Sequence, residues 1–139
     1  MTCDVVIIGA GPAGIFTAME MIKKGSTKKI IIVEKGKPIE KRSCPKNRTK
    51  KCVNCKPFCH ITTGFSGAGA FSDGKLSLSP EVGGSLPELI GEELAQETIW
   101  YTDGIYLEFG ADEKVEGVGQ DAKIKEIRKR AIQAGLKLV

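Results

Sequence analysis

Three glycines near the N-terminus have the spacing of a nucleotide-binding turn. Gly9, Gly11 and Gly14 follow the pattern G-x-G-x-x-G, directly after the apolar run Val5 to Ile8. In such a turn the first glycine lets the chain leave a strand, the second leaves room for a pyrophosphate, and the third lets the next helix pack closely. The helix N-terminus attracts phosphate through unpaired N–H groups and a partial positive charge. The pattern therefore predicts a diphosphate site.

An acidic residue follows at the distance that a ribose requires. Glu34 lies 20 residues after Gly14, at the end of the apolar stretch Lys29 to Glu34. A carboxylate at this place accepts a hydrogen bond from a ribose hydroxyl and repels a phosphate. The alternative, a glycine-rich turn in an ordinary α/β unit, leaves Glu34 unexplained. We therefore favour nucleotide binding.

Four cysteines form a second group that could do chemistry. Cys44, Cys52, Cys55 and Cys59 have the spacing C-x7-C-x2-C-x3-C, with His60 next to the last. Four thiolates could hold a zinc ion or an iron–sulfur cluster, and this is the interpretation we favour. Two others stay open: a redox-active dithiol made of Cys52 and Cys55, and unligated thiols in a lysine-rich flap.

The cysteines lie in a basic segment, residues 35–60, that shows no helical or strand periodicity. Residues 35–57 hold nine basic residues and one acidic residue, a local charge of +8 in a chain whose net charge is +4. Phe58 is the one aromatic residue of the segment, so a stacking platform for bases is missing. We expect an insertion that binds no nucleic acid.

A second glycine-rich loop spans residues 63–76, with the sequence TGFSGAGAFSDGKL. Its glycines allow a ligand to approach the backbone, and successive N–H groups can form a nest for an anion. A flexible linker is the alternative. Phe65, Phe71 and Leu76 interrupt the polarity that a linker would show, so we favour a loop that contacts the nucleotide.

Hydrophobic patterns predict the elements that position these residues. Strands over 5–8 and 29–34 flank a helix that ends near Gly25, and their continuous apolar runs suit a parallel sheet covered on both faces. The predicted fold is α/β and Rossmann-like. A third strand is expected over 136–139. Since a doubly wound domain needs about five or six strands, we expect residues 1–139 to be the N-terminal part of a longer protein.

The C-terminal half is predicted to be mainly helical. One helical stretch lies within 85–109, with Ser85 as its cap, and another runs from Asp121 to Ala134 with Asp121 as its cap. Four aromatic residues are expected to pack in a core or between domains: Trp100, Tyr101, Tyr106 and Phe109.

Composition indicates an ordinary soluble protein, with 41% hydrophobic and 27% charged residues. No apolar run approaches the roughly 20 residues of a membrane span, and the N-terminus lacks the basic region of a secretion signal. We expect a cytoplasmic protein with no membrane partner.

The motifs together resemble a known family. DVVIIGAGPAG with IIIVEKG resembles the FAD-binding N-terminus of two-dinucleotide-fold flavoproteins. The resemblance is close over residues 4–36 and 60–76 and loose over the rest of the chain. With the cysteine-containing insertion and GFSGAGAFSDGKL, the chain resembles FAD-dependent dehydrogenases described as NAD(FAD)-utilizing. The resemblance implies that the ADP half of FAD lies on the first turn and Glu34, and that the flavin lies near the second loop. The implied cofactor contacts are Gly9, Gly11, Pro12, Ala13, Gly14, Glu34, Lys35, Gly67, Ala68, Gly69, Ser72 and Asp73.

The resemblance also implies a function. The protein would be an oxidoreductase that transfers hydride or electrons through the flavin, with NAD(P)H as an electron donor bound outside residues 1–139 and an unidentified small-molecule substrate or redox partner. No catalytic acid or base is identified, although Asp73, Lys75 and His60 are titratable residues near the expected flavin end. Cys52 to Asn54 resembles the redox segment of flavin disulfide reductases, but the wider cysteine spacing of that family is missing. The alternative is a metal-binding or thiol-redox sensing module with regulatory nucleotide binding.

Overall fold

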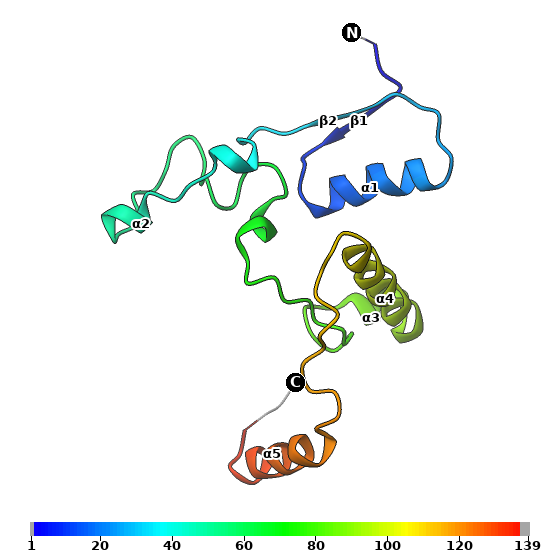
Figure 1. The fold of residues 1–139 in the computed structure, drawn as a ribbon, viewed down its shortest axis with the longest axis vertical. Helices are drawn as coiled ribbons and strands as arrows, with labels where there is room; N and C mark the ends of the chain where they lie inside the picture. The colour runs from blue at the N-terminus through cyan, green and yellow to red at the C-terminus, as the bar shows by residue number, and fades with distance from the viewer. Residues whose placement is uncertain (1, 137–139) are drawn as a thin grey trace. The chain divides into compact units, whose positions relative to one another are not determined.

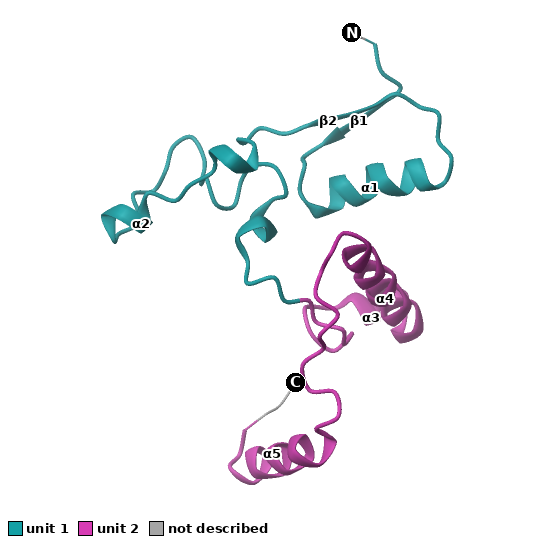
Figure 2. Cartoon of the chain, viewed as in Figure 1, with its two compact units in different colours: residues 1–75 teal, residues 76–139 magenta. Residues whose placement is uncertain are grey.

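The computed structural model describes residues 2–136 (Figure 1). The chain divides into two compact units, residues 1–75 and residues 76–139 (Figure 2). The strand predicted over 136–139 lies outside the described residues except for Leu136, which has no regular structure.

The first unit begins with a β-α-β arrangement. Strand β1 (Val5–Ile8) is followed by helix α1 (Pro12–Lys23) and by strand β2 (Ile30–Val33) (Figure 1). The strands are parallel, with Val5 opposite Ile30 and Ile8 opposite Val33. This arrangement confirms the predicted α/β fold, with a parallel sheet of two strands at a glycine turn.

Helix α1 covers one face of this sheet. Val5 and Ile7 are half-buried, while the alternate residues Val6 and Ile8 are exposed. A methyl group on Gly14 of α1 would lie 3.2 Å from Cγ2 of Ile7, which shows how closely the helix approaches the strand. The prediction that both faces are covered is wrong for the described residues, because Ile8 is 81% exposed. Within residues 2–136 no helix packs against the sheet face that carries Val6 and Ile8.

The remainder of the first unit is mostly irregular backbone. It contains two 3-10 turns, η1 (Ile39–Lys41) and η2 (Ala68–Phe71), and the short helix α2 (Lys46–Thr49). A parallel bridge joins Lys37 to Gly64, and the N–H of Phe65 donates to the carbonyl of Lys37 at 3.1 Å. The exit of β2 therefore runs beside the start of the second glycine loop.

The second unit is helical. It contains α3 (Leu86–Ile90), α4 (Glu92–Glu108) and α5 (Asp121–Gln133). Gly91, with φ of 84°, separates α3 from α4, so the predicted stretch within 85–109 is two helices. Ala95 and Ile105 of α4 are the buried hydrophobic residues of this unit in the described chain.

Two details of the helical prediction are wrong. Ser85 occupies the N-cap position of α3 but its side chain makes no cap hydrogen bond, and the N-cap of α5 is Gln120, with Asp121 already in the helix. Within residues 2–136 the aromatic residues of α4 and its end do not form a core, since Trp100 is 61% and Phe109 76% exposed, and their packing between domains stays a prediction. None of the helices within residues 2–136 has the length and apolar character that a membrane crossing requires.

Candidate nucleotide site and cysteine pocket

The first glycine turn is fixed to both strands. Gly9 has φ of 101°, a conformation that favours glycine, and its N–H donates to the carbonyl of Val33 at 2.7 Å. A Cβ on Gly14 would lie 2.1 Å from the carbonyl oxygen of Gly9. Only glycine at position 14 therefore lets α1 begin this close to the turn.

Gly11, unlike Gly14, has open space around it. It is the N-cap of α1, its φ of −80° is available to any residue, and a Cβ built on it meets no atom within 4 Å. The first turn of α1 has no acidic residue and no side-chain cap, so its N–H end is not neutralised by the chain. Open space beside a helix N-terminus is what a pyrophosphate requires. These residues fit the phosphate part of FAD.

Glu34 links the turn to the end of β2. Its Oε2 accepts a hydrogen bond from the N–H of Ala10 at 2.9 Å, and its Oε1 accepts one from the N–H of Gly36 at 2.7 Å. The N–H groups of Ala10 and then Gly36 hold the pKa of Glu34 below its ordinary value, with Lys35 and Arg42 adding to the effect. Because its pKa is lowered, Glu34 stays charged. A carboxylate has about four acceptor positions, so Glu34 keeps acceptor capacity for a ribose hydroxyl beyond the two hydrogen bonds that it already accepts.

The second glycine loop lies against the first turn. The N–H of Ser66 donates to the carbonyl of Ala10 at 2.8 Å. A Cβ on Gly67 would contact Cα of Gly11 and Cδ of Pro12, each at 3.4 Å. The structure thus brings Gly67 beside Gly11, although 55 residues separate them in the sequence.

A second close approach holds the same loop. A Cβ on Gly36 would lie 2.4 Å from both the nitrogen and Cα of Gly64, so the two backbones touch where β2 ends. Gly64 itself is buried and has φ of 133°. Glycine at both positions lets residues 36 and 64 run side by side.

Arg42 is the buried side chain that organises this region. It is 5% exposed, and its guanidinium donates only to backbone carbonyls: to His60 from Nε at 3.0 Å, to Gly67 from Nη2 at 2.9 Å, and to Ile61 and Phe65. The guanidinium also lies 4.8 Å from the centre of the Phe71 ring. Arg42 therefore ties the end of the cysteine segment to the second glycine loop.

Other predicted cofactor contacts lie at the surface of the first unit. The exposed ones include Pro12, Ala13, Lys35, Ala68 and Gly69. The ammonium of Lys35 lies 5.7 Å from the centre of the Phe58 ring. These positions leave the residues accessible to a ligand.

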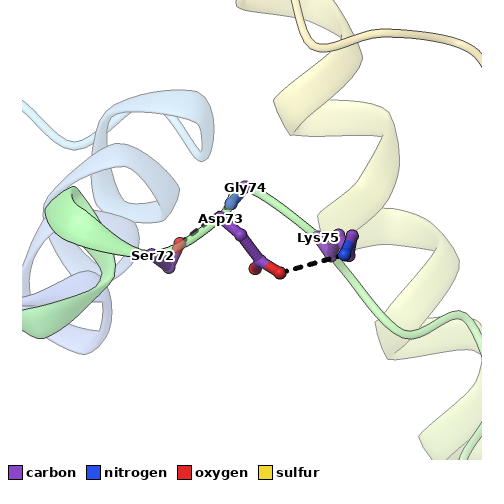
Figure 3. Close-up of polar contacts among 4 residues, drawn as sticks. All are labelled: Ser72, Asp73, Gly74 and Lys75. Carbon is purple, nitrogen blue, oxygen red and sulfur yellow. Dashed lines mark hydrogen bonds and ion pairs between the residues drawn. The ribbon is translucent and has the colours of Figure 1, made fainter.

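Ser72 and Asp73 form a local turn (Figure 3). The N–H of Gly74 donates to Oγ of Ser72 at 3.2 Å, and Lys75 Nζ lies 3.1 Å from Oδ2 of Asp73. Both members of the ion pair are largely exposed, and such pairs contribute at most about 1 kcal/mol. The predicted contacts Ser72 and Asp73 therefore keep solvent-accessible polar atoms.

The four predicted metal ligands line one pocket of about 150 Å³. Cys44, Cys52, Cys55 and Cys59 form its walls, together with His60. Within the described residues, however, no group of three or more His, Cys, Asp or Glu side chains is arranged to hold a metal ion. The structure gathers the cysteines that the spacing singled out, but not in the close set that one ion needs, so the metal site stays a prediction. All four are free thiols.

Cys59 differs from the other cysteines in its surroundings. The N–H of Thr62, the N–H of Ile61 and the hydroxyl of Thr62 donate to its sulfur and lower the pKa of the Cys59 thiol, with a further contribution from the charge of Arg42. The side chain is exposed. Hydrogen bonds of this kind stabilise a thiolate.

Sequence reasoning missed three residues that build this region: Ala10, Gly36 and Arg42. Arg42 looked like one of nine solvated basic residues, and nothing in its spacing marked it as buried. Gly36 did carry a signal, since a glycine directly after Glu34 and Lys35 leaves room for a crossing backbone.

One comparison with known proteins agrees with this geometry. Residues 4–43 match the model of a protein family described as FAD binding domain. The chain is also 39% identical over 72 residues to an uncharacterized protein of Clostridium beijerinckii (strain ATCC 51743 / NCIMB 8052). That alignment covers 52% of this chain and 13% of the relative, so the chain spans a small part of the relative's length. No solved structure matches.

Proposed function

We propose that this chain provides the FAD-binding part of a flavin-dependent oxidoreductase. The observation that carries the proposal is the open space beside Gly11, at the N-terminus of α1. The family match over residues 4–43 supports FAD as the nucleotide.

Each part of the site has a separate task in this proposal. The N–H end of α1 binds the pyrophosphate, and Glu34 accepts a hydrogen bond from the adenosine ribose. Gly67, held beside Gly11, limits the movement of the phosphates and directs the rest of the cofactor along residues 67–73. The bound flavin supplies hydride or electron transfer, and the protein supplies orientation and electrostatics. From the resemblance described above, we propose NAD(P)H as the electron donor.

Substitutions at Gly11 test the proposal. Gly11→Ala adds a methyl group to space that the protein leaves empty, and Gly11→Val adds more bulk at the same place. Because φ at this position suits any residue, we expect both variants to fold. We expect FAD retention, measured from the flavin absorbance of the purified protein, to fall about tenfold or more in Gly11→Val and less in Gly11→Ala, because the phosphates lose contact with the N–H groups.

The matched control is Gly104→Ala in α4. A Cβ on Gly104 also meets no atom within 4 Å, but the residue belongs to the second unit and is not part of the glycine turn. Its FAD content should equal that of the unchanged protein. Full FAD retention in Gly11→Val, with the fold intact by circular dichroism, would contradict the assignment of the turn.

A further inference from the structure

The buried Arg42 side chain holds two peptide groups of the second glycine loop. Its Nη1 donates to the carbonyl of Phe65, and its Nη2 donates to the carbonyl of Gly67 at 2.9 Å. These carbonyls belong to the peptide groups that join Phe65 to Ser66 and Gly67 to Ala68. Because Arg42 is only 5% exposed, water competes little for these hydrogen bonds. The guanidinium therefore fixes the orientation of both peptide groups.

The first of these peptide groups also contacts the first glycine turn. In a trans peptide the carbonyl and the N–H point in opposite directions, and the N–H of Ser66 donates to the carbonyl of Ala10 at 2.8 Å. Arg42 and Ala10 therefore hold the same peptide group from its two sides. Ser66 has φ of 66°, a left-handed conformation that a serine keeps only where its surroundings hold it. The hydrogen bond from Arg42 is part of those surroundings.

The second peptide group begins at a residue that packs against the start of α1. A Cβ on Gly67 would lie 3.4 Å from Cα of Gly11 and from Cδ of Pro12. Gly11 is also the position beside which the chain leaves open space at the N-terminus of α1. The carbonyl that Arg42 binds is attached directly to the Cα atom of Gly67. A shift of Arg42 would therefore move the backbone that lies next to Gly11.

We propose that Arg42 is a positioning residue for the cofactor, which acts through Ser66 and Gly67 and keeps the second glycine loop in place to receive the flavin half of FAD. This inference rests on the proposed function. Arg42 acts through the main chain of the loop and does not contact the cofactor itself. A loop that is already ordered loses little conformational entropy when a ligand binds, so it binds the ligand more tightly.

The test compares FAD with ADP, which has the adenosine and the two phosphates of FAD but lacks the flavin half. FAD binding to the full chain is measured from the change in flavin fluorescence, and ADP binding from displacement of FAD. In Arg42→Ala we expect the Kd for FAD to rise about tenfold or more and that for ADP less than about threefold, because only the longer ligand must order the released loop. A loss of folded protein alone would weaken both ligands by the same factor.

Arg42→Lys is a second variant that keeps the test valid if Arg42→Ala does not fold. Its ammonium keeps the charge but lacks the planar, forked arrangement of donors. The Kd for FAD should therefore rise to an intermediate value, with little change for ADP. Lys41→Ala is the matched control, because Lys41 is the neighbouring basic residue and is exposed. With its fold intact by circular dichroism, this control should bind both ligands as the unchanged protein does.

Three results would overturn the role of Arg42. These are an unchanged Kd for FAD in the folded Arg42 variants, a rise for ADP that equals or exceeds the rise for FAD, and the same change in Lys41→Ala as in Arg42→Ala. Failure of the unchanged protein to bind FAD or ADP would instead contradict the proposed function, and this inference would fail with it. The unchanged protein therefore distinguishes failure of the one from failure of the other.

Discussion

Glu34 has one structural role and one proposed role at the level of the single residue. Its carboxylate connects Ala10 of the first turn to Gly36 beyond β2, and we propose that the same group binds the ribose. Because both backbone N–H groups favour the charged form, the pKa of Glu34 in the folded protein lies below its ordinary value of 4.5. The stabilisation that it provides is therefore fully present above that value and is lost as pH falls through the lower folded-state pKa.

Glu34→Gln tests this link to pH. The variant keeps the shape of the side chain but turns an amide group toward one of the two N–H donors. We expect it to be less stable than the unchanged protein by about 1–2 kcal/mol at pH 7, with the difference shrinking below pH 4.5. The measurement is urea unfolding at pH 7 and at acid pH.

Glu40→Gln, at an exposed position in η1, provides the comparison for Glu34→Gln. It should change the free energy of unfolding little at either pH. A Glu34→Gln effect that is equally large in acid would show that the charge of Glu34 is not the cause.

At the level of elements, the second glycine loop owes its place to Arg42. The large apolar side chains of the loop, those of Phe65, Phe71 and Leu76, are all exposed, and η2 is exposed throughout. One guanidinium satisfies four carbonyls from residues 60–67. The loop is therefore positioned by hydrogen bonds to a side chain more than by packing.

Removal of that side chain should release the loop. In Arg42→Ala four carbonyls lose their donor, and we expect a loss of about 2–4 kcal/mol in stability. Hydrogen exchange at the N–H groups of Phe65 and Ser66 should accelerate, because both depend on the loop staying against Lys37 and Ala10. Arg42→Lys should give a partial effect, since an ammonium cannot reproduce the planar fork.

Arg48→Ala is the control for Arg42→Ala. Arg48 lies in the same basic segment but is exposed on α2, so its removal should leave exchange at Phe65 and Ser66 unchanged. Unchanged exchange at those two N–H groups in Arg42→Ala would contradict the organising role of Arg42.

At the level of the whole molecule, residues 2–136 leave an apolar face of the sheet exposed. Val6, Ile8 and Val33 are 51%, 81% and 48% exposed. Apolar patches on a monomer attract other apolar surfaces. We expect residues 1–139, prepared alone, to bind a hydrophobic dye, and the double variant Val6→Thr with Ile8→Thr to bind less of it while it keeps its circular dichroism spectrum.

The alternate residues of β1 give the opposite result. Val5 and Ile7 face α1 and are half-buried, so Val5→Thr with Ile7→Thr should destabilise the β-α-β unit and raise dye fluorescence. Equal effects of the two pairs would mean that β1 does not present distinct faces.

The sequence predicted the parts of this structure that depend on local pattern. The glycine spacing and the apolar runs identified β1, α1 and β2, because each glycine role follows from backbone geometry within a few residues. The gathering of Cys44, Cys52, Cys55 and Cys59 around one pocket was also anticipated, while the metal site that their spacing suggested stays a prediction. Whether the predicted cofactor contacts bind FAD stays a prediction.

Long-range contacts could not be predicted in this way. The pairing of Gly36 with Gly64 joins residues 28 positions apart, and neither has a side chain whose type would reveal a partner. The burial of Arg42 could not be recognised from the sequence, because several neighbouring residues have the same charge. Which member of a basic segment is buried depends on tertiary contacts. The break at Gly91 was missed because the apolar pattern continues across it.

The contacts of Arg42 determine which nearby positions can change during evolution without loss of its hydrogen bonds. All four acceptors are main-chain oxygens, which are the same for every amino acid. The residues at 60, 61 and 65 can therefore change without removing any of these hydrogen bonds, whereas position 42 has no substitute with the same reach. Distant relatives should therefore have an arginine about eight residues after the acidic residue that ends the second strand, even where the amino-acid sequence of the following loop differs.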